Sequence, residues 1–330
     1  MVEMRTVTFI EAITEAMKEE MERDERVYVI GEDIGIYGGV FKATRGLQSL
    51  FGPMRVIDSP LSENLIVGSS VGAAAMGLRP VPEIQFSDFI TPGMDQIIQQ
   101  AAKLRYRSGG SFSVPLVIRV CCGGEVGGGL YHSQINEAWF VHCPGLVVIA
   151  PAFPYDAKGL LKAAIRDENP CIYFEHKKLY RSIKQEIPDT DFTVPLGKAE
   201  IKRKGKDVTI VAYMLMVHKS LEAAEKLAKE GIECEVIDMR TLLPIDKETI
   251  LESVKKTGRA IIVQEAPKTG GVAGELSAII TEEAFEYLDA PIKRVTAPDT
   301  PPIPFSPPLE HFWLPNADKI IKAVKETMAY

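Results

Sequence analysis

The chain has 330 residues, of which 46% are hydrophobic and 25% are charged, and its formal net charge at pH 7 is −7. This composition is typical of a soluble globular protein that buries a sizeable core, and the length favours two domains. The acidic balance argues against nucleic acid as the main partner. No apolar run reaches the roughly 18 residues that a membrane span needs, so no membrane segment is expected.

The start of the chain and its cysteines indicate the compartment. The first twenty residues are amphipathic and acidic, unlike a secretory or transit peptide. We therefore expect a cytoplasmic protein, or one of the mitochondrial matrix if a presequence has been removed. The five cysteines are scattered and form no CxxC pair, which favours reduced thiols over a disulfide framework or a zinc site.

Helical and strand-like patterns alternate along the first half of the chain. Thr8 and Glu11 form a capping box before apolar residues at helical spacing. Further helices are expected after Ser62 and over 94–107. Short apolar runs without alternation are typical of parallel strands that are covered on both faces. These runs predict strands at 27–31, 55–58, 79–86, 114–120, 146–151 and 170–175, with another helix at 156–169.

A polar segment punctuated by prolines predicts a linker over 186–205, and strands and helices alternate again after it. The expected strands are 207–213, 234–239, 259–266 and 292–297, and the expected helices are 220–231, 246–256, 275–288 and 318–328. This order predicts an α/β fold of two domains, each a mainly parallel sheet flanked by helices. We expect the first domain over 1–185 and the second over 206–330.

The segment from Pro60 to Leu78 carries one formal charge, Glu63, among small and apolar residues. One interpretation is a tightly packed core helix whose first-turn carboxylate complements the helix dipole. The other is a partly buried functional carboxylate, whose pKa desolvation would raise and the helix N-terminus would lower. The sequence leaves both open.

A glycine-rich stretch leads to a histidine. Five of the seven residues from Gly123 to Gly129 are glycines, so the backbone there can pass close to a ligand. No Gly-Lys-Ser/Thr follows, so this is not a P-loop. His132 could donate a proton near neutral pH, or could be a solvated residue of a flexible loop. The other four histidines show no metal-ligand spacing, and the chain has neither a GxGxxG nor a GDG-type magnesium and diphosphate motif.

An acidic stretch at 274–292 contains no lysine or arginine. It is either a solvated helix face or a docking patch for a basic partner domain. Its acidic residues are Glu275, Glu282, Glu283, Glu286 and Asp289.

The chain resembles the beta subunit of the thiamine-diphosphate-dependent, decarboxylating component of 2-oxo-acid dehydrogenase complexes. The matching stretches follow one another along nearly the whole chain: VIGEDIGIYGGVFKATRGL, RVIDSPLSE, EIQFSDFITPGMDQI, KLRYRSGG, LYHSQ, HCPGLVV, DAKGLLKAAIRDENPCI, EVIDMRTLLPID and EAPKTGG. Three stretches are more similar to the branched-chain (2-oxoisovalerate) type than to the pyruvate type, although pyruvate and acetoin relatives share much of the pattern. They are EIQFSDF, LYHSQ and PCIYFEHKKLYR.

The resemblance implies a fold and roles for individual residues. The first domain would be the pyrimidine-binding type and the second the transketolase C-terminal type. Glu63 falls on the glutamate of the family's P-[LI]-[SC]-E motif, which hydrogen-bonds the cofactor's aminopyrimidine and so favours loss of the thiazolium proton. Phe89 matches the aromatic residue that packs on the pyrimidine, and Phe86 is nearby. His132 matches the histidine expected to transfer a proton during reductive acylation of lipoamide.

The resemblance also implies ions and partners. Thiamine diphosphate would be shared with an alpha subunit that holds the magnesium, in a heterotetramer of two alpha and two beta chains. A lipoyl acyltransferase would receive the acyl group from the 2-oxo acid. Some relatives bind a structural potassium ion, mostly through backbone carbonyls. The matching positions are Leu116, Val117, Ala164, Ile165, Asp167 and Asn169.

Three alternatives remain beside this interpretation. The chain could be a pyruvate or acetoin dehydrogenase beta subunit. It could be a self-sufficient enzyme similar to transketolase, although its length and the missing diphosphate motif argue against that. It could also be a non-catalytic assembly subunit, although the presence of Glu63 and His132 counts against that function.

Overall fold

The computed structural model describes residues 3–301 and 303–330. The described chain divides into two compact units. Unit 1 contains the described residues up to 122 together with 139–196, and unit 2 contains 123–138 together with the described residues from 197 onwards. The glycine-rich stretch and His132 therefore belong to unit 2, although they precede most of that unit by 60 residues or more along the chain.

Unit 1 is built on a parallel sheet whose strands lie in the order β6-β7-β5-β4-β2-β3. Every residue of β4, β5 and β7 is buried, as expected for strands covered on both faces. A separate antiparallel pair joins β1 to β8. The strand bounds are β1 (Met4–Thr8), β2 (Val27–Gly31), β3 (Val56–Asp58), β4 (Arg79–Ile84), β5 (Val117–Cys122), β6 (Val147–Ile149), β7 (Cys171–His176) and β8 (Lys184–Pro188).

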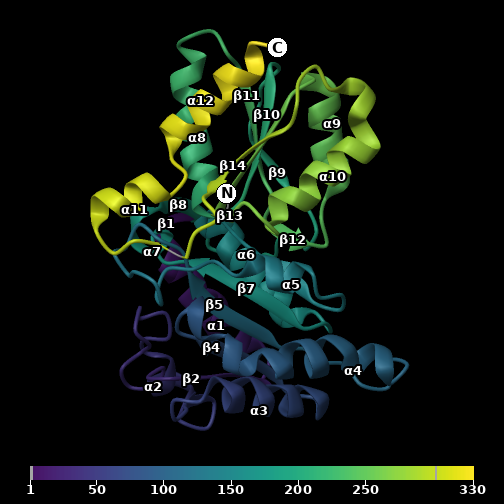
Figure 1. Ribbon diagram of the computed structural model, residues 1–330. Helices are drawn as coiled ribbons and strands as arrows, with labels where there is room; N and C mark the ends of the chain where they lie inside the picture. The colour runs from purple at the N-terminus through teal and green to yellow at the C-terminus, as the bar shows by residue number, and fades with distance from the viewer. Residues whose placement is uncertain (1–2, 302) are drawn as a thin grey trace. The chain divides into compact units, whose positions relative to one another are not determined.

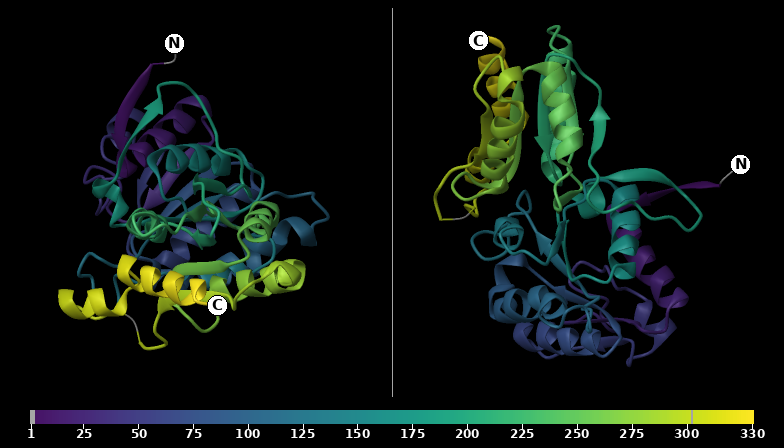
Figure 2. Two further views of the ribbon diagram at one scale, coloured as in Figure 1. Left: turned by 90° about the horizontal axis from the view of Figure 1, so that it is seen from above. Right: turned by 90° about the vertical axis from the view of Figure 1, so that its right-hand side faces the viewer.

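Helices cover both faces of this sheet. The capping box of Thr8 and Glu11 opens α1 as the sequence predicts, with both reciprocal bonds present. Helices α1 and α6 pack together on one face, and α3 packs against η2 and η3 on the other (Figure 2). The bounds are α1 (Phe9–Arg23), α2 (Leu47–Phe51), α3 (Glu63–Ala75), η1 (Ser87–Phe89), η2 (Thr91–Gly93), η3 (Gln96–Ala101), α4 (Ala102–Arg107), α5 (Glu137–Val141), α6 (Pro154–Arg166) and α7 (Leu179–Ser182).

Unit 2 contains a five-stranded sheet in the order β14-β13-β10-β11-β9. Its strands are parallel except β9, which runs antiparallel to β11. Figure 1 shows α8 and α12 on one side of this sheet and α9 and α10 on the other, and each pair is in contact. The bounds are β9 (Glu200–Arg203), β10 (Val208–Ala212), α8 (Leu215–Ala228), β11 (Cys234–Asp238), β12 (Thr241–Leu243), α9 (Lys247–Thr257), β13 (Ala260–Pro267), α10 (Val272–Ala284), η4 (Phe285–Tyr287), β14 (Lys293–Ala297), α11 (Pro307–Trp313) and α12 (Ala317–Met328).

The predicted fold class, two α/β units with mainly parallel sheets, is confirmed. Local details differ from the sequence-based expectations. The helix expected over 94–107 is interrupted by a π-helical segment over Gln96–Ala101 and is α-helical over Ala102–Arg107. Strand β9 lies inside the segment expected to be a linker. Among the described residues, no helix is long and apolar enough to cross a membrane.

Candidate active site

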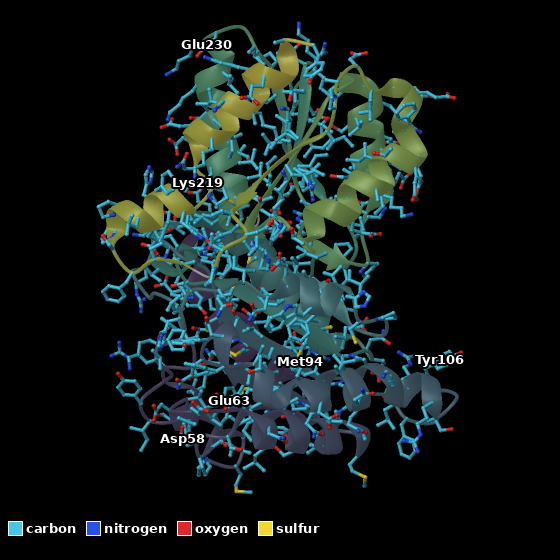
Figure 3. The ribbon with its side chains drawn as sticks, viewed as in Figure 1. Asp58, Glu63, Met94, Tyr106, Lys219 and Glu230 are labelled. Carbon is cyan, nitrogen blue, oxygen red and sulfur yellow. The ribbon has the colours of Figure 1, made fainter. Side chains whose placement is uncertain are left out.

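Glu63 is the first residue of α3 and lies at the end of unit 1 where the parallel strands finish. The Ser62 side chain caps the helix by accepting a bond from the Leu65 N–H at 3.4 Å. Figure 3 labels Glu63 and Asp58, which begin α3 and end β3. The Glu63 side chain is half-buried, so it is available to a ligand and yet partly shielded from water. In an open parallel sheet, the ends of the strands are the usual place for a ligand.

A second carboxyl group, Glu32, lies beside Glu63 in space. It follows β2 directly and is half-buried. Burial raises the pKa of Glu32 above its ordinary value, and the negative charge of Glu63 raises it further. One carboxylate oxygen, Oε1, is buried without a hydrogen-bond partner. The two carboxyl groups therefore interact, and Glu32 holds its proton to a higher pH than an exposed glutamate does.

Glu32 is not among the site residues that the sequence predicts. The available signal was its place directly after a predicted strand, in the stretch GEDIG. The turn that follows is fixed by Asp58, whose carboxylate accepts a bond from the Gly35 N–H at 2.6 Å. Glu32 and Glu63 are 31 positions apart, so only the parallel pairing of β2 with β3 brings their elements together.

Phe86 and Phe89 lie together at the end of β4, as part of one aromatic cluster. Their rings meet edge to face with centroids 5.9 Å apart, and Phe41 meets Phe86 in the same way at 5.5 Å. Both Phe86 and Phe89 are half-buried, so each ring keeps an exposed part. Edge-to-face packing fixes the direction of each ring. A flat heterocycle could stack on the exposed part of such a cluster.

Small residues let the segment after Phe89 pack closely on α3. A Cβ atom on Gly93 would lie 3.0 Å from Val67 and 3.4 Å from the Glu63 carbonyl oxygen. A Cβ atom on Gly68 would lie 3.5 Å from the Gln96 side chain. The glycines therefore set the spacing between the first turns of α3 and the chain that carries Phe89.

Beneath this end of the sheet lies a buried ionic cluster around Arg119. Its guanidinium donates to Glu83 at 2.6 Å and to both carboxylate oxygens of Glu175 at 2.6 and 2.8 Å. Tyr180 adds a bond to Glu175 at 2.7 Å. Burial raises the pKa of Glu83, while the positive charge of Arg119 lowers it. The cluster ties β4, β5 and β7 together with charge-assisted bonds.

His132 lies in unit 2, and its side chain is exposed. The backbone of the glycine-rich stretch before it makes hydrogen bonds to two carboxylates. Gly124 donates its N–H to the Glu265 carboxylate at 2.6 Å, and Gly127 donates to Glu310 at 3.3 Å. Both carboxylates are nearly fully buried. The interpretation of this stretch as a flexible surface loop is therefore too simple, because two of its backbone amides bond buried charges.

The segment that the resemblance assigns to potassium contains a protein cation. The Arg79 guanidinium donates to the carbonyl oxygens of Ile165 and Asp167 at 2.9 and 3.0 Å. Its other nitrogen bonds the carboxylate of Glu168. Arg79 thus supplies a positive charge to these two carbonyl groups.

The other assigned positions also have internal partners. The Leu116 carbonyl accepts a bond from the Cys171 N–H at 2.9 Å, within the pairing of β5 with β7 that includes Val117. The Asp167 carboxylate accepts two bonds from Asn169, at 2.7 and 2.8 Å. Each carbonyl oxygen has a second lone pair, so these bonds reduce its capacity for an ion without removing it. Within 3–301 and 303–330, no group of three or more His, Cys, Asp or Glu side chains could hold a metal ion.

Comparisons with known proteins agree with this architecture. Residues 5–183 match the family of the transketolase pyrimidine-binding domain, and residues 197–320 match that of the transketolase C-terminal domain. A solved structure titled split gene transketolase, inactive beta4 tetramer, has the same fold, with a TM-score of 0.80 over 98% of each chain at 24% identity.

Curated relatives carry the comparison to the level of the family. The 2-oxoisovalerate dehydrogenase subunit beta of Bacillus subtilis (strain 168) is 52% identical over 98% of this chain and 99% of its own length. The pyruvate dehydrogenase E1 component subunit beta of the same organism is 48% identical over 99% of this chain and its whole length. The chain therefore belongs to the family of 2-oxo-acid dehydrogenase beta subunits, with a transketolase-type pyrimidine-binding domain and a transketolase-type C-terminal domain.

Proposed function

We propose that this chain acts with an alpha subunit in a heterotetramer that decarboxylates a branched-chain 2-oxo acid and transfers the acyl group to lipoamide. The single observation that carries the proposal is the pair of carboxyl groups at the strand ends of unit 1. Glu63 begins α3, and its charge raises the pKa of half-buried Glu32, which has an oxygen without a hydrogen-bond partner. Such a pair suits a ligand that brings its own donor.

The residues present fit thiamine diphosphate, which would supply the electron sink for decarboxylation when bound. Glu63 would hold a ring nitrogen of the aminopyrimidine by a hydrogen bond. Phe86 and Phe89 would pack against the ring, since each keeps part of its face exposed. Glu32 retains its proton more readily than an exposed acid, which limits repulsion with Glu63. His132 would move a proton at the lipoyl sulfur.

In this proposal the alpha subunit binds the magnesium and the diphosphate, because the present chain lacks a GDG-type motif. The protein would work in a reducing compartment such as the cytoplasm, which agrees with its five cysteines, none of which forms a disulfide. The branched-chain substrate is favoured by the 52% identity to a 2-oxoisovalerate dehydrogenase subunit, against 48% to a pyruvate dehydrogenase subunit.

Potassium binding is also a proposal, and the residues fit it only in part. The carbonyl groups of Ile165 and Asp167 already bond Arg79, so an ion would have to share them with a guanidinium. Melting temperatures in potassium, sodium and choline chloride at equal ionic strength test this. A rise specific to potassium supports the site, whereas equal melting temperatures would mean that Arg79 alone serves these carbonyls.

The acidic face of α10 and η4 is proposed as the docking surface for the acyltransferase. Glu275, Glu282, Glu286 and Asp289 are exposed there. Phe285 is 68% exposed beside a groove of about 750 Å³ between α10 and the start of β14. Exposed aromatic and acidic side chains together suit a basic partner domain.

Co-expression with an alpha subunit tests the main proposal. We expect the pair to release CO₂ from branched 2-oxo acids faster than from pyruvate or 2-oxobutanoate, and each chain alone to be inactive. Glu63→Gln should lower the rate by about 100-fold or more, since a positioned acid–base group contributes about that much. Glu25→Gln, at an exposed position, is the matched control. Full activity of Glu63→Gln, or activity of this chain alone, would refute the proposal.

A further inference from the structure

The glycine-rich stretch 123–129 is fastened at its base to β13. The Gly124 N–H donates to Glu265 at 2.6 Å, and Glu265 is only 2% exposed. A bond from a backbone amide to a buried carboxylate is charge-assisted and therefore stronger than a bond between neutral groups. Gly124 and Glu265 are 141 positions apart, so this bond joins the loop to a distant part of unit 2.

A second carboxylate holds the middle of the stretch. Gly127 donates to Glu310 of α11 at 3.3 Å, and Glu310 is only 6% exposed. Between the two anchors, Glu125 pairs with Lys219 of α8 at 2.7 Å; Figure 3 labels Lys219. Glu125 has a φ of 59°, a conformation that glycine adopts easily and glutamate does not. The path of the backbone is therefore imposed by its partners.

The glycines themselves allow close contact with the segment around α11. A Cβ atom on Gly124 would lie 3.1 Å from Leu314 and 3.2 Å from Ile303. A Cβ atom on Gly129 would lie 3.0 Å from Phe305, and Gly129 has a φ of 69°. Ile303 and Leu314 belong to a buried apolar cluster with Ala297 and Trp313. The stretch thus packs against this buried cluster, and its last glycine, Gly129, is three residues before His132.

A third buried acid lies near the base of the loop. Glu137 is fully buried and accepts a bond from the Tyr213 hydroxyl at 2.6 Å. Burial raises the pKa of Glu137 to about 7, and the charge of Glu265 contributes to this rise. Burial and the neighbouring carboxylate of Glu265 both disfavour the ionised form of Glu137 at the base of the loop.

We propose that Glu265 and Glu310 are positioning residues, which hold the backbone of 123–129 and thereby fix where His132 is presented to the incoming lipoyl group. This rests on the proposed function, because the role of His132 in acyl transfer belongs to it. Neither carboxylate touches the substrate in this proposal. Each acts through a backbone amide of the loop.

The test uses the reconstituted holoenzyme with Glu265→Gln, Glu310→Gln and, as matched control, the exposed Glu252→Gln. Two rates are compared: decarboxylation with an artificial electron acceptor, and acylation of free lipoamide. Amide hydrogen exchange of peptides covering 123–131 reports the loop directly. In both anchor variants we expect amide exchange in the loop to become about 10-fold faster and the acylation rate to fall about 10-fold. This is the effect expected from the loss of one charge-assisted bond. Decarboxylation and the KM of the 2-oxo acid should change less than about 3-fold.

The outcomes separate the two proposals. Faster exchange with unchanged acylation would overturn the positioning role, and unchanged exchange would overturn the anchoring itself. An equal loss in both rates would show a general structural defect and would also overturn it. If Glu265→Gln does not fold, Glu310→Gln still provides the test, because Glu310 lies on the short helix α11 outside the sheet. A normal acylation rate in His132→Gln would refute the assigned role of His132 and leave the exchange result standing.

Discussion

The buried side chain of Glu137 links the stability of unit 2 to pH. Its pKa is raised to about 7 by burial, with a smaller contribution from Glu265, while the Tyr213 hydroxyl lowers it. An unfolded glutamate has a pKa near 4.5. Between these two values the folded state binds more protons than the unfolded state. The free energy of unfolding therefore falls as pH rises through this window.

Glu137→Gln should remove this dependence. From pH 5 to pH 7.5 the difference in free energy of unfolding, variant minus parent, should shift in favour of the variant by roughly 2.4 kcal/mol, since one pKa unit corresponds to about 1.4 kcal/mol. Urea unfolding followed at several pH values measures it. Glu230→Gln, at an exposed site, should show no such shift. A pH-independent difference for Glu137→Gln would mean that Glu137 is already ionised in the folded protein.

The residue scale also shows what sequence reasoning could find in the site. The sequence predicts Glu63 as a candidate because it is the only charge in a run of small and apolar residues, which is a local property of the chain. It does not predict Glu32, which lies in a stretch rich in acids and glycines where nothing distinguishes it. The pKa of Glu32 is raised partly by the charge of Glu63, and the two residues are close only in the folded sheet.

At the scale of elements, α3 depends on where its glycines lie. Gly72 is exposed on the helix, and nothing lies within 4 Å of a Cβ atom there. Gly93, outside the helix, has Val67 and the Glu63 carbonyl close to its Cβ position. The two glycines thus have opposite expected responses to an added methyl group.

Gly72→Ala should stabilise the protein by about 0.5–1 kcal/mol, because alanine loses less conformational entropy than glycine in a helix. Gly93→Ala should destabilise it by about 1–3 kcal/mol and lower activity, because the added methyl group pushes η2 away from α3 and shifts the segment behind Phe89. Urea unfolding and the decarboxylation rate of the reconstituted enzyme measure both effects. Equal behaviour of the two variants would contradict this account of the packing.

The elements themselves were largely predictable. Most strands of the two sheets in the described units correspond to runs rich in apolar residues, because a strand that is covered on both faces buries nearly all of its side chains. The elements that the sequence does not predict lie in polar or proline-containing segments, where the apolar periodicity is weak. Strand β9 (Glu200–Arg203) lies at an edge of its sheet and contains no buried residue, and α11 begins with two prolines. The π-helical turn at 96–101 has no signature in the hydrophobic periodicity.

At the scale of the whole molecule, the proposed docking surface adds to an overall acidic charge. The net charge is −7, and the face of α10 and η4 contributes five acids. Lys247 and Arg259 lie 2.8 and 3.4 Å from Glu283 and Asp289, so part of this charge is already neutralised. The remaining field would still attract a basic domain and speed its association.

Replacing Glu282, Glu283, Glu286 and Asp289 with lysines should weaken binding of the acyltransferase's basic domain by at least about 10-fold, since charge reversal turns attraction into repulsion. Titration calorimetry at two salt concentrations measures it, and the parent affinity should fall with added salt. Reversing the exposed acids Glu22 and Glu25 on unit 1 is the control. Unchanged affinity in the fourfold variant would exclude this surface as the docking site.

The sequence by itself determined the α/β class, the order of most elements and the family, and it singled out Glu63 as a candidate, because these depend on local patterns of apolar and charged residues. Only the tertiary structure placed Glu32 beside Glu63, grouped 123–138 with unit 2, and fastened that stretch to Glu265 and Glu310 across 141 and 183 positions of chain. Contacts at such separations leave no local pattern, since each partner is a single residue whose neighbour is chosen by the packing of whole strands and helices.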